Sequence, residues 1–128
     1  ACLQPQKTPV RLTRLIQSAD LVVLPYDSVD QVTSGVLVDA VAAGRPVVAT
    51  AFPHAVELLA SGAGIVVPQR DPVALGQAIR SVLTQPRLAA SMAAEARRLA
   101  PGLSWPAVAR RYCVLADQVV ATRESVTT

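Results

Sequence analysis

The sequence predicts one α/β domain, residues 1–128, built from a parallel sheet with helices on its faces. Short apolar runs alternate along the chain with longer segments whose apolar side chains recur at helical spacing. Short loops join these segments, which is typical of right-handed crossovers between parallel strands. At 128 residues the chain is long enough to bury one core but too short to form two lobes.

The predicted strands are continuous apolar runs, as expected for strands buried on both faces of a parallel sheet. They span residues 20–25, 46–50 and 64–67. We expect them to be parallel neighbours, with a helix over residues 35–43 crossing between the first two. That helix is apolar on nearly every face and ends at Gly44, while residues 10–19 favour a shorter helix before the sheet.

The C-terminal half predicts three further helices. Asp71 is a helix N-cap followed by Pro72 at the first helical position. The last helix, about 105–121, opens at Ser104-Trp105-Pro106. The apolar stripes expected on the three helices are Leu75, Ile79, Val82 and Leu83, then Leu88, Met92, Ala96 and Leu99, and finally Val108, Tyr112, Leu115 and Val119.

The charge distribution argues against a nucleic-acid partner. The net charge is +3, and residues 72–128 hold seven arginines against three acidic residues, so the positive charge belongs to the C-terminal helices. Nucleic-acid surfaces usually place aromatic side chains among the basic ones, whereas only 3% of this chain is aromatic. A solvated helix face therefore explains the arginines, and no nucleic-acid binding is expected.

Composition also argues against a membrane-spanning or metal-binding protein. No apolar stretch reaches the roughly 18 residues of a membrane-spanning helix, and the N-terminus does not resemble a signal peptide, so we expect a cytoplasmic protein. Peripheral contact with a membrane stays an open question. Cys2 and Cys113 lie far apart and outside any CxxC or Cys/His cluster, so the sequence predicts no metal site.

A ligand site is expected where the three strands end, because open α/β sheets bind ligands at the carboxyl ends of their strands. Three loops fall there, over residues 25–35, 51–54 and 68–71. In the first, Thr33-Ser34-Gly35 stands at the mouth of a helix whose unpaired amides and dipole can receive a phosphate. From spacing alone, the simpler interpretation is that Ser34 only caps its own helix.

Several sequence blocks agree in order and spacing with one known family. They are AD-LVVLPY, Q-x-x-SGVL-x-DA, AGRPVVAT, ELL, G-x-G-IVVP, DP-x-AL and SW, between Ala19 and about Val119. This pattern resembles the C-terminal, donor-binding lobe of the retaining GT-B glycosyltransferases, which include sucrose and glycogen synthases and mannosyltransferases. The resemblance implies a Rossmann-like but incomplete GT-B C-terminal domain, whose last helix crosses back onto the acceptor-binding lobe.

The resemblance also assigns roles to individual residues. In the family, two glutamates separated by seven residues flank the donor site, and here those positions hold Gln31 and Asp39. Gln31 takes the catalytic position beside the donor sugar, where an amide binds hydroxyls but cannot offset positive charge at the anomeric carbon. Asp39 accepts hydrogen bonds from the ribose, and its apolar neighbours argue against an ordinary surface carboxylate. The amides expected at the diphosphate and sugar are those of Thr33, Ser34, Gly35 and Val36.

His54, in the loop after the second strand, is a further candidate for donor contact. It is the only histidine and has no sequence neighbours that would make a catalytic set, so a plain loop histidine is the alternative. The basic residue that neutralises the diphosphate in the family belongs to strands not found here, and residues 25–44 contain no Arg or Lys. No metal and no cofactor are expected, because the sequence has no Asp-x-Asp pair.

The resulting hypothesis is the donor-binding part of a transferase that moves a sugar from a nucleoside diphosphate to an acceptor with retention. An epimerase-like GT-B enzyme and a non-catalytic α/β module are the alternatives. The expected partners are a nucleotide sugar and the missing acceptor lobe, and the chain alone is expected to be inactive. Any nucleotide binding should be weak, and the last helix should either self-associate or complete the local core.

Overall fold

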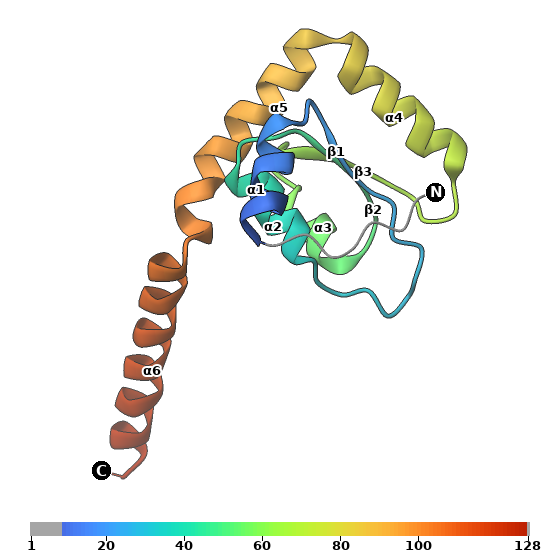
Figure 1. Ribbon diagram of the computed structural model, residues 1–128. Coiled ribbons are helices and arrows are strands. Elements are labelled where there is room, and N and C mark those ends of the chain that lie inside the picture. Colours follow the sequence, from blue (N-terminus) through green and yellow to red (C-terminus); the bar gives the residue numbers. More distant parts are fainter. Residues whose placement is uncertain (1–8, 128) are drawn as a thin grey trace.

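The computed structural model describes residues 9–127, which form three short strands and six α-helices joined by short connections (Figure 1). In chain order the elements are α1 (Pro9–Ser18), β1 (Val22–Leu24), α2 (Gly35–Ala42), β2 (Val47–Thr50), α3 (Pro53–Leu58), β3 (Gly64–Val67), α4 (Pro72–Thr84), α5 (Pro86–Leu99), the 3-10 helix η1 (Ala100–Leu103) and α6 (Trp105–Thr127).

The sheet has the order β1-β2-β3, and both of its strand pairs are parallel, as predicted. Val23 pairs with Val48 in the first ladder, and Val48 with Ile65 in the second. The first strand is shorter than the predicted 20–25, since it begins only at Val22 and ends at Leu24, where Pro25 has no amide hydrogen to continue the ladder. Helix α2 makes the predicted crossover, and Gly44 follows its end with a φ of 71°, a conformation that glycine adopts readily.

Successive residues of β2 face opposite sides of the sheet and so belong to two cores. Val47 and Ala49 pack into the larger core with residues of α2, α3 and the C-terminal half of α5. Val48 packs on the other face with Val67 of β3 and residues of α4 and α5. Since β2 is completely buried, the middle of the sheet is fixed from both sides. This fixes the direction in which the strand ends and their loops point.

One predicted core residue of α4 lies at the surface. Leu83 is 58% exposed, whereas Ala78 and Val82 are buried against the sheet. Each helical residue is turned by about 100° from its neighbour, so Val82 occupies the core position and Leu83 falls beside the stripe. The stripe of α5 is confirmed, with Met92 and Ala96 buried and Leu88 and Leu99 partly buried.

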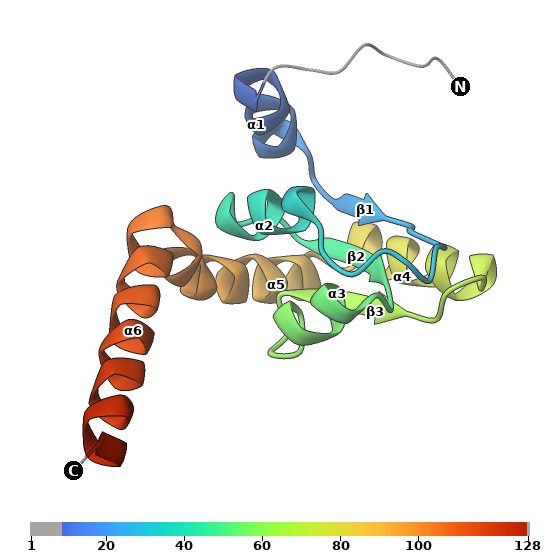
Figure 2. The same cartoon turned by 90° about the horizontal axis from the view of Figure 1, so that it is seen from below.

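Helix α6 leaves the layered part of the molecule and extends away from it (Figures 1 and 2). It is longer than the predicted 105–121; its beginning contacts η1 and lies across a cleft from α2. Tyr112 is 69% exposed, and Leu115 and Val119 are also exposed, so the alternative that this stripe completes the local core is wrong. None of the helices within residues 9–127 is long and apolar enough to cross a bilayer.

Candidate functional site

The loops that follow the three strands meet at the carboxyl edge of the sheet, as the sequence predicts. Thr50, the last residue of β2, donates its hydroxyl to the carbonyl of Tyr26 in the loop after β1. Gln69, just after β3, donates its side-chain amide to the carbonyls of Tyr26 and Ser28, each at 3.4 Å. The sequence analysis did not single out Thr50 and Gln69, although a polar residue directly after an apolar strand is the signal that marks them.

Ser34 is the N-cap of α2 and the centre of the loop's hydrogen bonding. Its hydroxyl accepts a hydrogen bond from the amide of Leu37 at 3.2 Å, which confirms the capping interpretation. Its own amide donates to Nδ1 of His54 at 3.3 Å, and the amide of His54 donates to the carbonyl of Val32 at 3.1 Å. His54 therefore belongs to the first turn of α3 and not to a loop, because Pro53 begins that helix.

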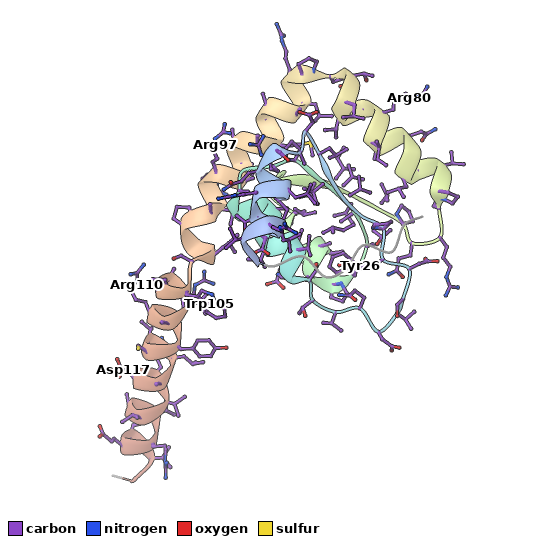
Figure 3. All side chains as sticks on the ribbon, viewed as in Figure 1. Tyr26, Arg80, Arg97, Trp105, Arg110 and Asp117 are labelled. Atoms are coloured by element: carbon purple, nitrogen blue, oxygen red, sulfur yellow. The ribbon has the colours of Figure 1, made fainter. Side chains whose placement is uncertain are left out.

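Tyr26 connects this loop to the larger core. Its ring packs edge-on against the buried ring of Phe52, with centroids 5.2 Å apart, and its hydroxyl lies 3.4 Å from the hydroxyl of Ser34 (Figure 3). An edge-on aromatic pair of this kind is favourable beyond the area that it buries. The N-terminus of α2 is thus held by contacts from the loop after β1 and from α3.

The capping leaves two predicted amides of α2 available. The first amides of a helix have no acceptor within it, and Ser34 satisfies only that of Leu37. No described side chain accepts from the amides of Gly35 and Val36, which carry the positive end of the helix dipole. The amide of Ser34 is already bound to His54, so of the predicted donors Gly35 and Val36 are the better placed for an anion.

Gln31 lies half-buried in the same loop, four residues before Gly35. Its side-chain amide donates to the carbonyl of Thr33, so it folds over the loop's own backbone. That bond uses one of the two amide hydrogens, and the side-chain carbonyl remains as an acceptor. Gln31 thus lies in the loop that leads into α2, and its role beside the donor sugar stays a prediction.

Asp39 is placed differently from the sequence expectation, because it is exposed. Its neighbours Ala40 and Val41 turn into the core, and the carboxylate points outward from α2. It lines a cleft of about 540 Å³ between α2 and the segment formed by η1 and the start of α6. Within residues 9–127, no side chain pairs with this carboxylate, so it can accept hydrogen bonds from a ligand in the cleft.

Arg70 brings a positive charge to the same edge of the sheet. It follows β3, and its guanidinium lies 3.8 Å from the carboxylate of Asp27 after β1. Its φ of 59° is the only positive value among the described non-glycine residues, a conformation that is uncommon for a long side chain. In the part of the chain that the structure describes, no three His, Cys, Asp or Glu residues gather as metal ligands would.

Residues 6–85 match the model of the family described as group 1 glycosyl transferases. The chain belongs to this family. The matched range contains the sheet, the capped helix α2 and all three converging loops, whereas the side of the Asp39 cleft formed by η1 and α6 lies outside it. No curated protein matches the sequence of this chain.

Two solved structures are similar in fold to this chain. Over 88% of the chain it is similar to sucrose-phosphate synthase from Thermosynechococcus elongatus, with 26% sequence identity and a TM-score of 0.70. Over 68% it is similar to WaaG, a glycosyltransferase involved in lipopolysaccharide biosynthesis, with 31% identity and a TM-score of 0.59. The chain spans only 28% and 24% of those proteins, so the expected GT-B architecture is confirmed for this part alone.

Proposed function

We propose that this chain binds the nucleoside-diphosphate sugar of a glycosyl transfer that retains the configuration at the anomeric carbon. The observation that carries the proposal is the arrangement along α2. Its N-terminus is fixed at the carboxyl edge of the sheet with the amides of Gly35 and Val36 available, and Asp39 follows one turn later in the cleft.

The diphosphate would bind at the mouth of α2. Two amides and the helix dipole favour negative charge there, and the charge that develops on the leaving diphosphate during transfer is stabilised in the same way. Because residues 25–44 contain no Arg or Lys, binding should be weak. Arg70, in the loop after β3, brings a positive charge to the same edge of the sheet, although Asp27 partly offsets it.

The sugar would lie beside Gln31, which can bind hydroxyl groups through its side-chain carbonyl. A neutral amide adds little to the stabilisation of positive charge at the anomeric carbon, so this position acts in orientation more than in electrostatics. We expect no metal ion and no cofactor to take part. The remaining work of the chain is then to position the donor and to stabilise the departing diphosphate.

The acceptor would be bound outside this chain, which spans about a quarter of each similar structure. We therefore propose that residues 1–128 bind donor but do not transfer the sugar without an acceptor-binding lobe. An assay with the isolated chain, a nucleotide sugar and a panel of acceptors tests this directly. Measurable turnover would contradict it.

The donor proposal is tested by replacing Asp39. Loss of a charge-assisted hydrogen bond costs about 1.5–3 kcal/mol, so Asp39→Ala should weaken nucleotide binding tenfold or more. Saturation-transfer NMR with UDP-, GDP- and ADP-sugars identifies the ligand, and calorimetric titration measures the change. Asp117→Ala on the far part of α6 is the matched control (Figure 3). Equal affinity of the Asp39 variant and the wild type would remove the assignment.

A further inference from the structure

We infer that the neutral imidazole of His54 positions the N-terminus of α2, so that donor binding weakens as His54 becomes protonated. The inference rests on the proposed function, because it takes the first amides of α2 as the groups that bind the diphosphate. His54 then acts through Ser34 and needs no contact of its own with the donor. It is a positioning residue, and the direction of its pH effect distinguishes it from a histidine that binds phosphate directly.

His54 holds the end of the loop after β1 in two places. Its backbone amide donates to the carbonyl of Val32 at 3.1 Å, and its Nδ1 accepts from the amide of Ser34 at 3.3 Å. The start of α3 is itself fixed, because Phe52 and Ala55 are buried in the larger core. The last residues of the loop are therefore placed relative to the core by one residue of α3.

The bond to Ser34 requires a neutral imidazole. A neutral ring has one nitrogen that accepts and one that donates, whereas both nitrogens of a protonated ring donate. Because Nδ1 accepts from the amide of Ser34, the ring hydrogen of His54 belongs on Nε2. Protonation would set an N–H group of the ring against the N–H group of Ser34, and that amide would lose its acceptor.

Loss of this bond should change the geometry at the mouth of α2. Ser34 is only 6% exposed, so its amide cannot turn to solvent unless the residue moves. Ser34 also caps the helix, because its hydroxyl accepts from the amide of Leu37. A shift of Ser34 therefore weakens the cap and displaces the amides of Gly35 and Val36, which the proposed function assigns to the diphosphate.

His54 is the group at this edge of the sheet that changes charge in the neutral range. The titratable groups on the surrounding elements are Tyr26, Asp27 and Asp30 after β1, Asp39 on α2, Glu57 on α3 and Arg70 after β3. Within residues 9–127, none of them forms an ion pair or a hydrogen bond with the imidazole. Histidine ordinarily titrates between about pH 5 and 8, whereas carboxylic acids, phenols and guanidinium groups ordinarily titrate outside that range. An effect of pH on the mouth of α2 in this range is therefore assigned to His54.

Calorimetric titration across this range tests the inference. The ligands are UDP-, GDP- and ADP-glucose, whose two phosphate groups are both esterified and so keep their charge from about pH 8 to about pH 5. Affinity should fall roughly three- to tenfold as the pH is lowered, as expected for loss of one hydrogen bond. The midpoint should equal that of imidazole protonation followed by NMR, where the signal is unambiguous because His54 is the only histidine. Constant affinity, or affinity that rises at lower pH because an imidazolium binds phosphate, would overturn the inference.

Three variants separate the role of Nδ1 from that of the ring. The side-chain oxygen of asparagine is as many bonds from the backbone as Nδ1 is, and it accepts a hydrogen bond without titrating. His54→Asn should therefore keep the affinity measured at pH 8 to within about twofold and lose the pH dependence. His54→Ala and His54→Gln, which offer no acceptor at that place, should bind as weakly as the protonated wild type at every pH. A weak Asn variant, or full affinity in the Gln variant alone, would show that the ring itself contacts the ligand and would overturn the inference.

Glu57→Gln is the matched control, because Glu57 is exposed on the same helix, three residues after His54. It should keep the pH dependence of the wild type. A further measurement needs no ligand: at one pH, the amide of Ser34 should exchange with solvent faster in His54→Ala than in the wild type or in His54→Asn. Equal exchange in the three proteins would overturn the inference.

These outcomes also separate this inference from the proposed function. If Asp39→Ala weakens nucleotide-sugar binding but the wild-type affinity does not fall with pH, the donor assignment stands and the inference fails. If none of the three nucleotide sugars binds at any pH, the proposed function fails and the inference fails with it.

Discussion

Glu95 and Arg98 form a bidentate pair on α5. Arg98 Nε donates to both carboxylate oxygens of Glu95 at 3.0 Å. Hydrogen bonding to Arg98, and next to Ser61, lowers the pKa of Glu95 from its ordinary 4.5 to about 2. The folded state therefore favours the ionised carboxylate more than the unfolded state does.

This lowered pKa predicts a defined effect of acid on stability. The contribution of Glu95 is fully present above pH 4.5 and is lost as the pH falls from about 4.5 to about 2. Glu95→Gln should remove this part of the acid dependence and change stability at pH 7 only slightly, since exposed pairs contribute little. Urea unfolding of both proteins between pH 2 and 7 measures it, and parallel pH profiles would contradict the prediction.

At the scale of residues, the sequence predicted local chemistry better than long-range placement. Ser34 is the cap that its position before the helix indicates, because capping depends on only three following residues. The sequence did not predict the exposure of Asp39. Its neighbours along the chain are apolar, but successive residues of a helix point in different directions, so these neighbours can be buried while Asp39 is exposed. Its proximity to Trp105 and Arg111 could not be predicted either, because it depends on the angle at which α6 leaves η1.

Two glycines show how elements constrain the sequence. Gly64 of β3 lies opposite Val47, and a Cβ atom there would come within 2.5 Å of the Val47 carbonyl oxygen. Gly76 lies within α4, and a Cβ atom there would meet nothing within 4 Å. The first glycine is required by close approach of two strands, whereas the second only lowers the helical preference of α4.

Alanine at these glycines should therefore have opposite effects. Gly64→Ala should destabilise by about 1–3 kcal/mol, because the β2–β3 ladder must shift to admit the methyl group. Gly76→Ala should stabilise by up to about 1 kcal/mol through helix propensity. Denaturant unfolding of both variants tests the pair, and a Gly64→Ala protein as stable as the wild type or more stable would show that the close approach at Gly64 has no energetic cost.

At the scale of elements, periodicity predicted all three strands and their parallel order. The sheet follows from continuous apolar runs and short crossovers, which are local signals. The loops converge as expected because parallel strands end at one edge. Leu83 was misplaced because an amphipathic helix specifies its core face only to within one residue at the border of the stripe.

At the scale of the molecule, α6 presents an apolar face that nothing within residues 9–127 covers. Tyr112, Leu115 and Val119 are all more than half exposed. Burial of such side chains contributes roughly 1.5–3 kcal/mol each, which is enough to hold two copies together. We expect the isolated chain to self-associate through this face when no other lobe occupies it.

Light scattering over a concentration series tests the association. The mass should rise above that of the monomer, and Leu115→Glu with Val119→Glu should return it to the monomer. Val73→Glu on α4 is the matched control, because Val73 is equally exposed but lies outside the stripe. A monomeric mass for the wild type at every concentration would exclude association.

The way in which the loop over residues 25–34 is attached determines how it can move. Its ends are tied to Thr50, Gln69 and His54, but Val29 at its centre is 80% exposed and packs in neither core. Such a segment can open while the sheet stays intact, so its amide hydrogens should exchange with solvent long before those of β2. Gln31 belongs to this loop and should therefore move when the loop opens. Under the proposed function, the opening of these ten residues would limit the rates at which a donor enters and leaves, and a bound donor should slow the amide exchange of this loop.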